Sequence, residues 1–290
     1  MGFLEFLNKL IGRNEPMPVK ENTSPSNVPK KYMEETELMR ILEQSEMSTV
    51  RITATVEDNM PLTASKFLGK PYFPANKNYP TDKTGKPMIM LAQINFAEVP
   101  HLNNYPEAGI LQFYIAAKDD LYGVNFDDFT DQTSFRVLFH TIVDENNLNP
   151  SVPVFNLRND DVYTPITVEH RLTFRLEKEY VPHSDWRFEM YFGKNYFDFS
   201  SEYENDALWE KYETGDIANP GGHKIGGYAY FTQWDPRSKE SYSDYILLLQ
   251  IDSEGDHILW GDVGVGNLFI REEDLKRLDF SSVLYTWDCY

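Results

Sequence analysis

The chain has 290 residues, 41% of them hydrophobic, which is ample for a buried core and excludes wholesale disorder. Its 27 lysine and arginine residues against 46 aspartate and glutamate residues give a net charge of −19 at pH 7. Because binding to phosphate backbones depends on lysine and arginine, this balance argues against nucleic-acid binding and favours a cationic partner.

The N-terminal segment, residues 1–31, differs from the rest of the chain. Residues 1–11 predict a short amphipathic helix, because their large apolar side chains share one face: Phe3, Phe6, Leu7 and Leu10. Residues 12–31 contain several prolines among Asn, Ser and Lys, which is typical of a flexible linker. The helix is expected to dock on a partner, to make peripheral contact with a membrane surface or to pack on its own body.

The remaining residues, 32–290, predict one α+β domain of mostly antiparallel sheets with a few helices. Helices are expected at 31–47, with Leu38, Ile41 and Leu42 on one face, at 202–213 and at 272–278. Apolar and alternating runs predict strands at 50–56, 88–96, 108–116, 133–143, 152–157, part of 163–176, 188–191, 228–233, 245–251, 258–260 and 266–270. The most apolar of these, 245–251, is expected to be covered on both faces.

Three sequence blocks occur twice in the same order and at a nearly constant offset. Residues 69–73 (GKPYF), 89–95 (IMLAQIN) and 109–115 (GILQFYI) correspond to 227–231 (GYAYF), 246–252 (ILLLQID) and 264–270 (GVGNLFI). This pattern predicts an internal duplication: two similar subdomains around a pseudo-two-fold axis, with a cleft between them. Copy one covers about 61–121, an insertion covers about 122–215, and copy two covers about 216–278.

Each copy carries a glutamine in the middle of its apolar strand, Gln93 in the first and Gln250 in the second. A buried amide costs about 1–3 kcal/mol when its hydrogen bonds are unmet, so the fold must supply partners. Two interpretations stay open. Each amide bonds the backbone of the loop before its strand, or both line a ligand cleft between the copies.

Two further motifs in copy two are candidate sites. In residues 260–264 (WGDVG), Asp262 either bonds the N–H groups of its own turn or contacts a ligand beside the Trp260 ring. The glycine-rich stretch 221–227 lacks the spacing of a P-loop or a dinucleotide fingerprint, and Gly227 is expected in a close-packed turn. The cleft candidates for ligand binding are thus Gln93, Gln250, Trp260, Asp262 and Gly227.

Nothing in the sequence points to a metal, a cofactor or a catalytic residue. The acidic stretch 252–263 fails the calcium-loop pattern at its sixth and twelfth positions, and the histidines lack zinc-ligand spacing. There is no Gly-x-Ser-x-Gly elbow. The single cysteine, Cys289, excludes an internal disulfide, no apolar run is long enough to span a bilayer, and no secretory signal is present. We therefore expect a cytoplasmic protein that is not an enzyme.

The motif order resembles the YwqG-like family of bacterial proteins over residues 32–290. The resemblance rests on residues 69–74 (GKPYFP), 79–80 (YP), 91–94 (LAQI), 109–113 (GILQF), 225–228 (IGGY), 249–252 (LQID) and 260–264 (WGDVG). It implies an internally duplicated α+β protein of unknown function, and an association of some relatives with toxin systems implies an immunity or accessory role. Family members usually carry Trp where this chain has Tyr79, which weakens a ligand-stacking role there.

The leading hypothesis is a non-enzymatic binding protein whose acidic surface recognises a basic protein partner. The alternative is a hydrolase or carbohydrate-binding protein with its site in the cleft between the repeats. The two differ in where they place function, since the first uses surface charge and the second needs a concave pocket near Asp262.

Overall fold

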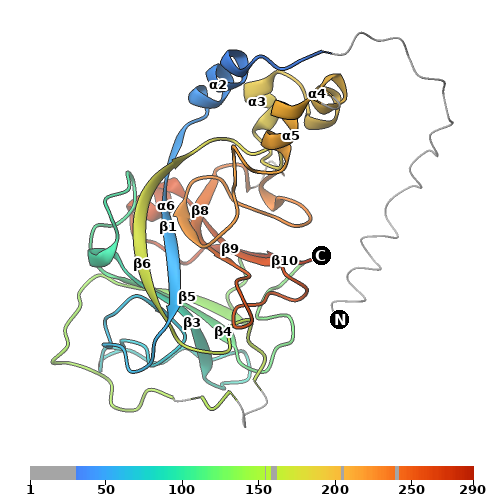
Figure 1. The fold of residues 1–290 in the computed structure, drawn as a ribbon. Helices are drawn as coiled ribbons and strands as arrows, with labels where there is room; N and C mark the ends of the chain where they lie inside the picture. The colour runs from blue at the N-terminus through green and yellow to red at the C-terminus, as the bar shows by residue number, and fades with distance from the viewer. Residues whose placement is uncertain (1–30, 154, 158–161, 204–205, 239–241) are drawn as a thin grey trace.

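A computed structural model describes residues 31–153, 155–157, 162–203, 206–238 and 242–290 (Figure 1). The helix predicted at 1–11 lies outside these residues, as does the linker predicted at 12–31 except for its last residue. The described residues form five α-helices and two short 3-10 turns: α2 (Glu35–Gln44), α3 (Phe188–Phe192), α4 (Tyr196–Glu202), α5 (Ala207–Glu213), α6 (Glu272–Lys276), η1 (Phe96–Glu98) and η2 (Pro236–Ser238). None of these helices has the length and apolar character that crossing a membrane requires.

The centre of the fold is a curled ten-stranded sheet in the order β10-β9-β8-β7-β1-β6-β2-β3-β4-β5, in which every pair of neighbours is antiparallel. Its strands are β1 (Met47–Val56), β2 (Lys66–Phe67), β3 (Met88–Asn95), β4 (Ile110–Ala116), β5 (Phe135–His140), β6 (His170–Glu179), β7 (Lys224–Gly226), β8 (Tyr245–Asp252), β9 (Val265–Arg271) and β10 (Leu284–Asp288). The predicted mostly antiparallel sheet with a few helices is confirmed.

The long central strands β1 and β6 pair over their whole length and divide the sheet into two sets of four strands. We call β2–β5 with their loops the first half and β7–β10 with their loops the second half. Both halves have a register shift at the same place, between Met90 and Ala92 in β3 and between Leu247 and Leu249 in β8. In each case the shift precedes the glutamine that the repeat places in the strand.

Strands β3 and β4 are buried on both faces, and so is most of β8, because one continuous apolar core runs through both halves. A second apolar cluster lies where α2 and the helices α3–α5 pack together, at the end of the molecule away from β3–β5 (Figure 1). Leu38, Ile41 and Leu42 bury in it from α2, so the predicted helix face is confirmed, although the helix is shorter than 31–47 at both ends.

Several predicted elements differ from the structure. The strand predicted at 188–191 is wrong, because these residues form α3, where the rings of Phe188 and Phe192 stack one helical turn apart with centroids 4.1 Å apart. Residues 228–233 form no strand, since side chains bond their backbone in place of a neighbouring strand. At 258–260 only Ile258 makes isolated bridges, and the described residues of 152–157 form no strand. The strand predicted within 163–176 is β6, which begins at His170. The helix predicted at 202–213 is α5, which begins at Ala207.

Candidate functional site

The two strand glutamines hold the loops of their own halves. Gln93 is fully buried; its Oε1 accepts a hydrogen bond from Tyr72 N–H at 2.9 Å, and its Nε2 donates to the carbonyls of Leu62 and Ala64 at 2.7 and 2.8 Å. Every polar group of this amide therefore bonds the chain itself. In the segment from 61 to 72 only Lys66 and Phe67 form a strand, β2, which pairs with β3. The Gln93 side chain holds the segment to β3 on both sides of β2, and Asn95 Nδ2 adds a bond to the Thr63 carbonyl at 3.0 Å.

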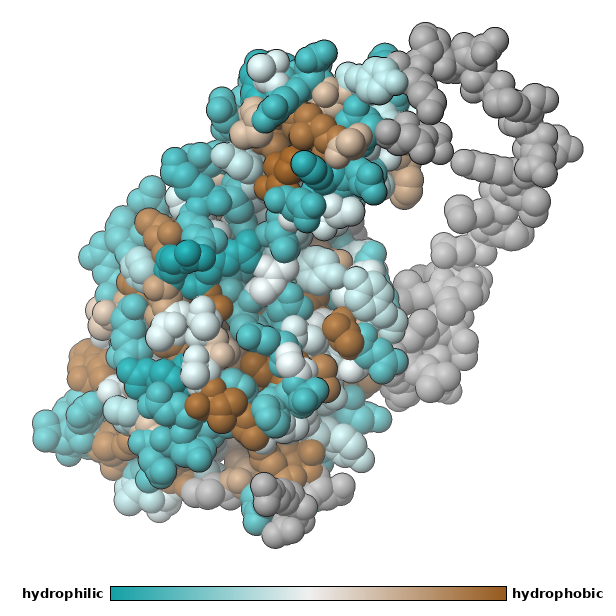
Figure 2. All heavy atoms as spheres, in the orientation of Figure 1, coloured by the Kyte–Doolittle hydropathy of each residue, from teal (hydrophilic) through white to brown (hydrophobic). Residues whose placement is uncertain are grey.

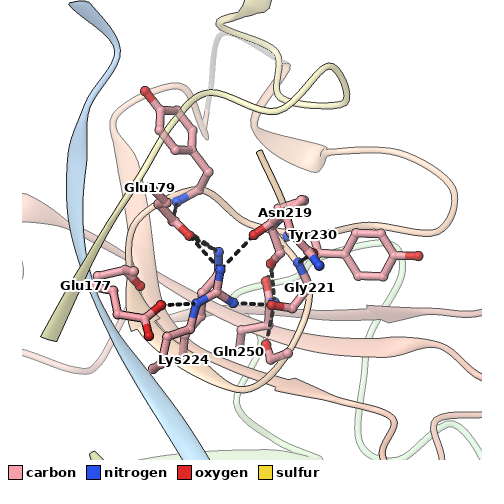
Figure 3. Close-up of polar contacts among 12 residues, drawn as sticks. Glu177, Glu179, Asn219, Gly221, Lys224, Tyr230 and Gln250 are labelled. Atoms are coloured by element: carbon pink, nitrogen blue, oxygen red, sulfur yellow. Dashed lines mark hydrogen bonds and ion pairs between the residues drawn. The ribbon is translucent and has the colours of Figure 1, made fainter. Parts of the chain in front are cut away.

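Gln250 repeats this arrangement in the second half (Figure 3). Its Oε1 accepts from Tyr230 N–H at 2.8 Å, and its Nε2 donates to the carbonyls of Pro220 and Gly222 at 2.9 and 2.8 Å. Gln250 is also fully buried. In the strand order β7, β1, β6 and β2 lie between β8 and β3, so the two glutamines are not neighbours in the sheet.

A charged cluster lies beside Gln250, formed by the buried Glu179 and Lys224 and the half-buried Arg51, and we call it the Glu179 cluster. Figure 3 labels Glu179, Lys224 and Gln250. Lys224 Nζ lies 3.1 and 2.9 Å from the two carboxylate oxygens of Glu179, and Arg51 Nη2 lies 3.2 Å from Oε2. The Tyr228 N–H also donates to Glu179. Burial lowers the pKa of Lys224 to about 8, and the negative charge of Glu179 opposes that shift.

Gly227 packs directly against the Glu179 carboxylate. Its φ of 78° lies in the left-handed region, and a Cβ there would overlap Glu179 Oε1 and lie 2.9 Å from Thr49 Cβ. The structure thus brings two of the sequence candidates to β7, since Gly227 directly follows this strand and Gln250 of β8 pairs with its first residue, Lys224.

The remaining candidates lie apart from this cluster. Trp260 is fully buried and packs against the rings of Tyr122 and Trp287, so its indole belongs to the core. Asp262 is exposed, and its carboxylate accepts no hydrogen bond from the described residues. Neither residue lines any of the three cavities described in the structure.

The first half has a lysine and a glycine at the places of Lys224 and Gly227. Lys66 pairs with Arg171 of β6 as Lys224 pairs with Arg51 of β1. Lys66 is buried, and its Nζ donates to the carbonyls of Pro61 and Lys70 at 2.8 and 2.9 Å in place of a carboxylate. Burial lowers the pKa of Lys66 to about 8, opposed by the charge of Glu169.

Gly69 is also left-handed, with φ at 80°, and a Cβ on it would lie 2.6 Å from Glu169 Oε2. Glu169 is half-buried, and its carboxylate makes no hydrogen bond and no ion pair within 4.0 Å to any described residue. A carboxylate therefore lies over the glycine in both halves, but only the second half provides it with cations.

The largest described cavity, about 570 Å³, opens at this glycine, and we call it the Tyr79 cavity. Its polar lining includes Asp58, Lys70 and Glu169, and apolar side chains including Met90 and Phe155 form other parts of its wall. The Tyr79 ring is held by Phe73 and Tyr114, with centroids 5.1 and 5.6 Å away. Burial raises the pKa of Tyr79 well above its usual range, and its hydroxyl has no hydrogen-bond partner among the described residues.

Sequence reasoning missed Lys66 and Glu169. The spacing from Lys66 to Gly69 equals that from Lys224 to Gly227, and comparing the repeats at that position would have found the lysines. Glu169 carries no such signal, because it belongs to neither repeat and reaches the glycine only through the fold. Among the described residues, no group of three His, Cys, Asp or Glu side chains is placed to hold a metal ion.

Acidic side chains on the surface turns are a further feature of the structure. Several of these aspartates accept a hydrogen bond from the N–H two residues further along, at 2.8–3.1 Å: Asp82, Asp119, Asp128, Asp131, Asp144 and Asp279. None of them makes an ion pair with a cation in the described part of the chain. These turns hold the carboxylates in place without neutralising them.

A search of curated proteins finds none that matches the chain. The sequence profile of a family described as a domain of unknown function, DUF1963, matches residues 65–289. That span includes both halves of the sheet, with both glutamines and both lysine–glycine pairs. The chain therefore belongs to the DUF1963 family.

Proposed function

We propose that the protein is a non-enzymatic binding protein whose acidic surface binds a basic protein partner. The observation that carries this proposal is that the turn aspartates are bonded to their own backbone and form no ion pair with a cation of the described residues. Their negative charge therefore stays available to a partner, and the net charge of −19 gives the attraction a long range at low ionic strength.

The surface is suited to such a partner. Hydrophilic residues cover most of the face shown in Figure 2, and hydrophobic residues form separate patches between them. A number of exposed carboxylates have no ion-pair partner among the described residues, including Asp120, Asp127, Asp256 and Asp262. Complementary charge of this kind speeds encounter and selects partners more than it adds affinity.

The proposal includes an internally duplicated scaffold, with the two halves as its copies. The strand order, the shared register shifts and the equivalent bonds of Gln93 and Gln250 support it. On this basis each copy gains a fourth strand, β5 in the first and β10 in the second, so the copies extend beyond 121 and 278. The resemblance to YwqG-like proteins gives the finer form of the proposal, an immunity or accessory role in a toxin system.

The alternative, a hydrolase or carbohydrate-binding protein with its site between the repeats, gains no support from the residues it invoked. The side-chain amides of Gln93 and Gln250 are hydrogen-bonded to the loops of their own halves, and Trp260 is buried in the core. The Tyr79 cavity lies on the first half, so it is not a site between the copies.

A crosslinking pull-down from the native host, at low and at high salt, tests the proposal. Two variants make it specific: Asp120, Asp127, Asp256 and Asp262 are changed together to Asn, or together to Glu as a control that keeps the charge. We expect a basic protein that is retained at low salt, lost at high salt, lost with the Asn variant and kept with the Glu variant. Equal retention by both variants at both salt concentrations would refute the proposal.

A further inference from the structure

The carboxylate of Glu169 differs from that of Glu179 because no cation among the described residues contacts it. In the Glu179 cluster the carboxylate receives Lys224 Nζ at 2.9 Å and Arg51 Nη2 at 3.2 Å. Beside the first half, Lys66 Nζ is bonded to carbonyl oxygens, and Glu169 has no ion pair within the described part of the chain. The first half therefore has a carboxylate whose strongest type of partner is missing.

The arginine that corresponds to Arg51 is also engaged elsewhere. Arg51 and Arg171 stand opposite Lys224 and Lys66 in the same antiparallel register. Arg171 Nη2 lies 3.9 Å from Glu98 and forms no ion pair with Glu169. An arginine or lysine from outside the chain would thus supply to Glu169 what Arg51 supplies to Glu179.

The space in front of Glu169 suits such a side chain. The Tyr79 cavity, at about 570 Å³, is within the range of about 300–1,000 Å³ that is usual for ligand pockets. Asp58 adds a second carboxylate to its lining, and the exposed Lys70 is its only basic side chain among the described lining residues. Tyr79 offers a hydroxyl that has no hydrogen-bond partner among the described residues, and an aromatic ring whose face can bind a cation.

We propose that the Tyr79 cavity binds a basic side chain, arginine or lysine, of the protein partner. Its cationic group bonds Glu169 and its apolar stem lies along Tyr79 and Met90. This inference rests on the proposed function, because the partner it invokes is the basic protein that the acidic surface attracts. It adds a defined anchor to what would otherwise be diffuse attraction between charged surfaces.

The test uses capped tripeptides, Gly-Arg-Gly and Gly-Lys-Gly, titrated into the full chain at low salt and followed by NMR. Matched peptides carry citrulline in place of arginine, which keeps the shape and removes the charge, and norleucine in place of lysine, which keeps the four-carbon stem and removes the ammonium group. We expect the cationic peptides to bind at least tenfold more tightly than their neutral counterparts. Equal binding of charged and neutral peptides would overturn the inference.

Three substitutions test whether the peptides bind in the Tyr79 cavity. Glu169→Gln keeps the shape of the side chain and should lower the affinity for the cationic peptides at least tenfold. Tyr79→Phe should lower it a few-fold. Glu43→Gln, at an exposed site on α2, makes the same charge change away from the cavity and should leave binding unchanged. If Glu169→Gln and Glu43→Gln bind the peptides equally, the cavity is not the anchor.

The pull-down and the peptide titration together distinguish the proposed anchor in the Tyr79 cavity from the proposed function of the acidic surface. A basic partner that is still captured in a salt-dependent way by Glu169→Gln with undiminished affinity would overturn the anchor and leave the acidic-surface proposal standing. If no basic protein is captured at low salt and the tripeptides do not bind, the proposed function itself is refuted.

Discussion

The two halves of the sheet handle the same element differently. Each places a lysine in its short strand, a left-handed glycine three residues later, and a carboxylate over that glycine. In the second half the lysine and the carboxylate pair in the interior, with 0% and 6% of their surfaces exposed. In the first half Lys66 bonds the backbone and Glu169 faces a cavity.

If the proposed anchor is right, one scaffold serves stability in the Glu179 cluster and recognition at the Tyr79 cavity. A buried ion pair that loses one partner is costly, so the Glu179 cluster is fixed by the fold. A half-buried carboxylate beside a cavity contributes little to stability and is free to bind a ligand. The following substitutions test that contrast, from the largest expected effect to the smallest.

The first prediction compares the same exchange in both halves. Glu179→Gln leaves the buried Lys224 without its carboxylate and Arg51 with Glu177 alone, and it should lower the free energy of unfolding by about 3–5 kcal/mol. Glu169→Gln should lower it by about 1 kcal/mol or less, because no ion pair is lost. Urea denaturation of both variants measures the difference. Equal losses would contradict the contrast between the halves.

The second prediction concerns the glycine under Glu179. Gly227→Ala combines a left-handed backbone with overlap against Glu179 and should cost about 3 kcal/mol of unfolding free energy. Gly85→Ala is the matched control, since Gly85 has φ at 81° and nothing within 4 Å of a Cβ, and should cost about 1–2 kcal/mol. Thermal unfolding that ranks Gly85→Ala at or above Gly227→Ala would show that Glu179 does not restrict this site.

The third prediction concerns the amide that ties the 220–230 loop to β8. Gln250→Met leaves Tyr230 N–H and two carbonyls without partners, which should cost about 2–3 kcal/mol. Gln93→Met should cost a similar amount through the same loss in the first half. Gln44→Met, at an exposed position of α2, is the control and should stay within about 0.5 kcal/mol. If the urea midpoints of Gln250→Met and Gln93→Met equalled that of Gln44→Met, neither amide would be a loop anchor.

The fourth prediction uses the pH dependence of stability. Burial lowers the pKa of Lys66 from 10.5 to about 8, so between these values the unfolded chain binds more protons than the folded one. Stability from this group therefore rises with pH from about 8 to 10, by up to about 1.4 kcal/mol per pH unit.

Lys66→Met removes that contribution. The difference in unfolding free energy between wild type and Lys66→Met should change with this slope over pH 8–10, whereas Lys70→Met, at the exposed neighbour, should give a flat difference. If the difference in unfolding free energy between wild type and Lys66→Met does not change over pH 8–10, burial does not lower the pKa of Lys66.

The sequence was a good guide to the sheet where apolar runs are long. Strands β3, β4, β8 and β9 follow directly from the repeated blocks, and α2 follows from the spacing of Leu38, Ile41 and Leu42. Strand β2 was missed because two residues make no pattern, and β10 because it lies beyond the repeated blocks. A strand was expected at 188–191, where aromatic residues favour strands, but packing against α4 and α5 makes residues 188–192 helical.

The candidate site was only partly predictable. Repetition singled out the strand glutamines and Gly227, which hold loops and accommodate a carboxylate. Glu169 and Glu179 come from the two ends of β6, far along the chain from the glycines they cover. Only the sheet order, with β6 between β1 and β2, brings them there. A charge paired through tertiary structure leaves no periodic signal in the sequence.

The central claim, that this acidic chain binds a basic protein through an anchored cation, is tested most directly by one measurement. Wild type and Glu169→Gln are used side by side in the crosslinking pull-down at low and at high salt. The account predicts a basic protein retained by wild type at low salt, released at high salt and captured at least tenfold less by Glu169→Gln. Retention that is unaffected by both salt and this substitution would contradict it.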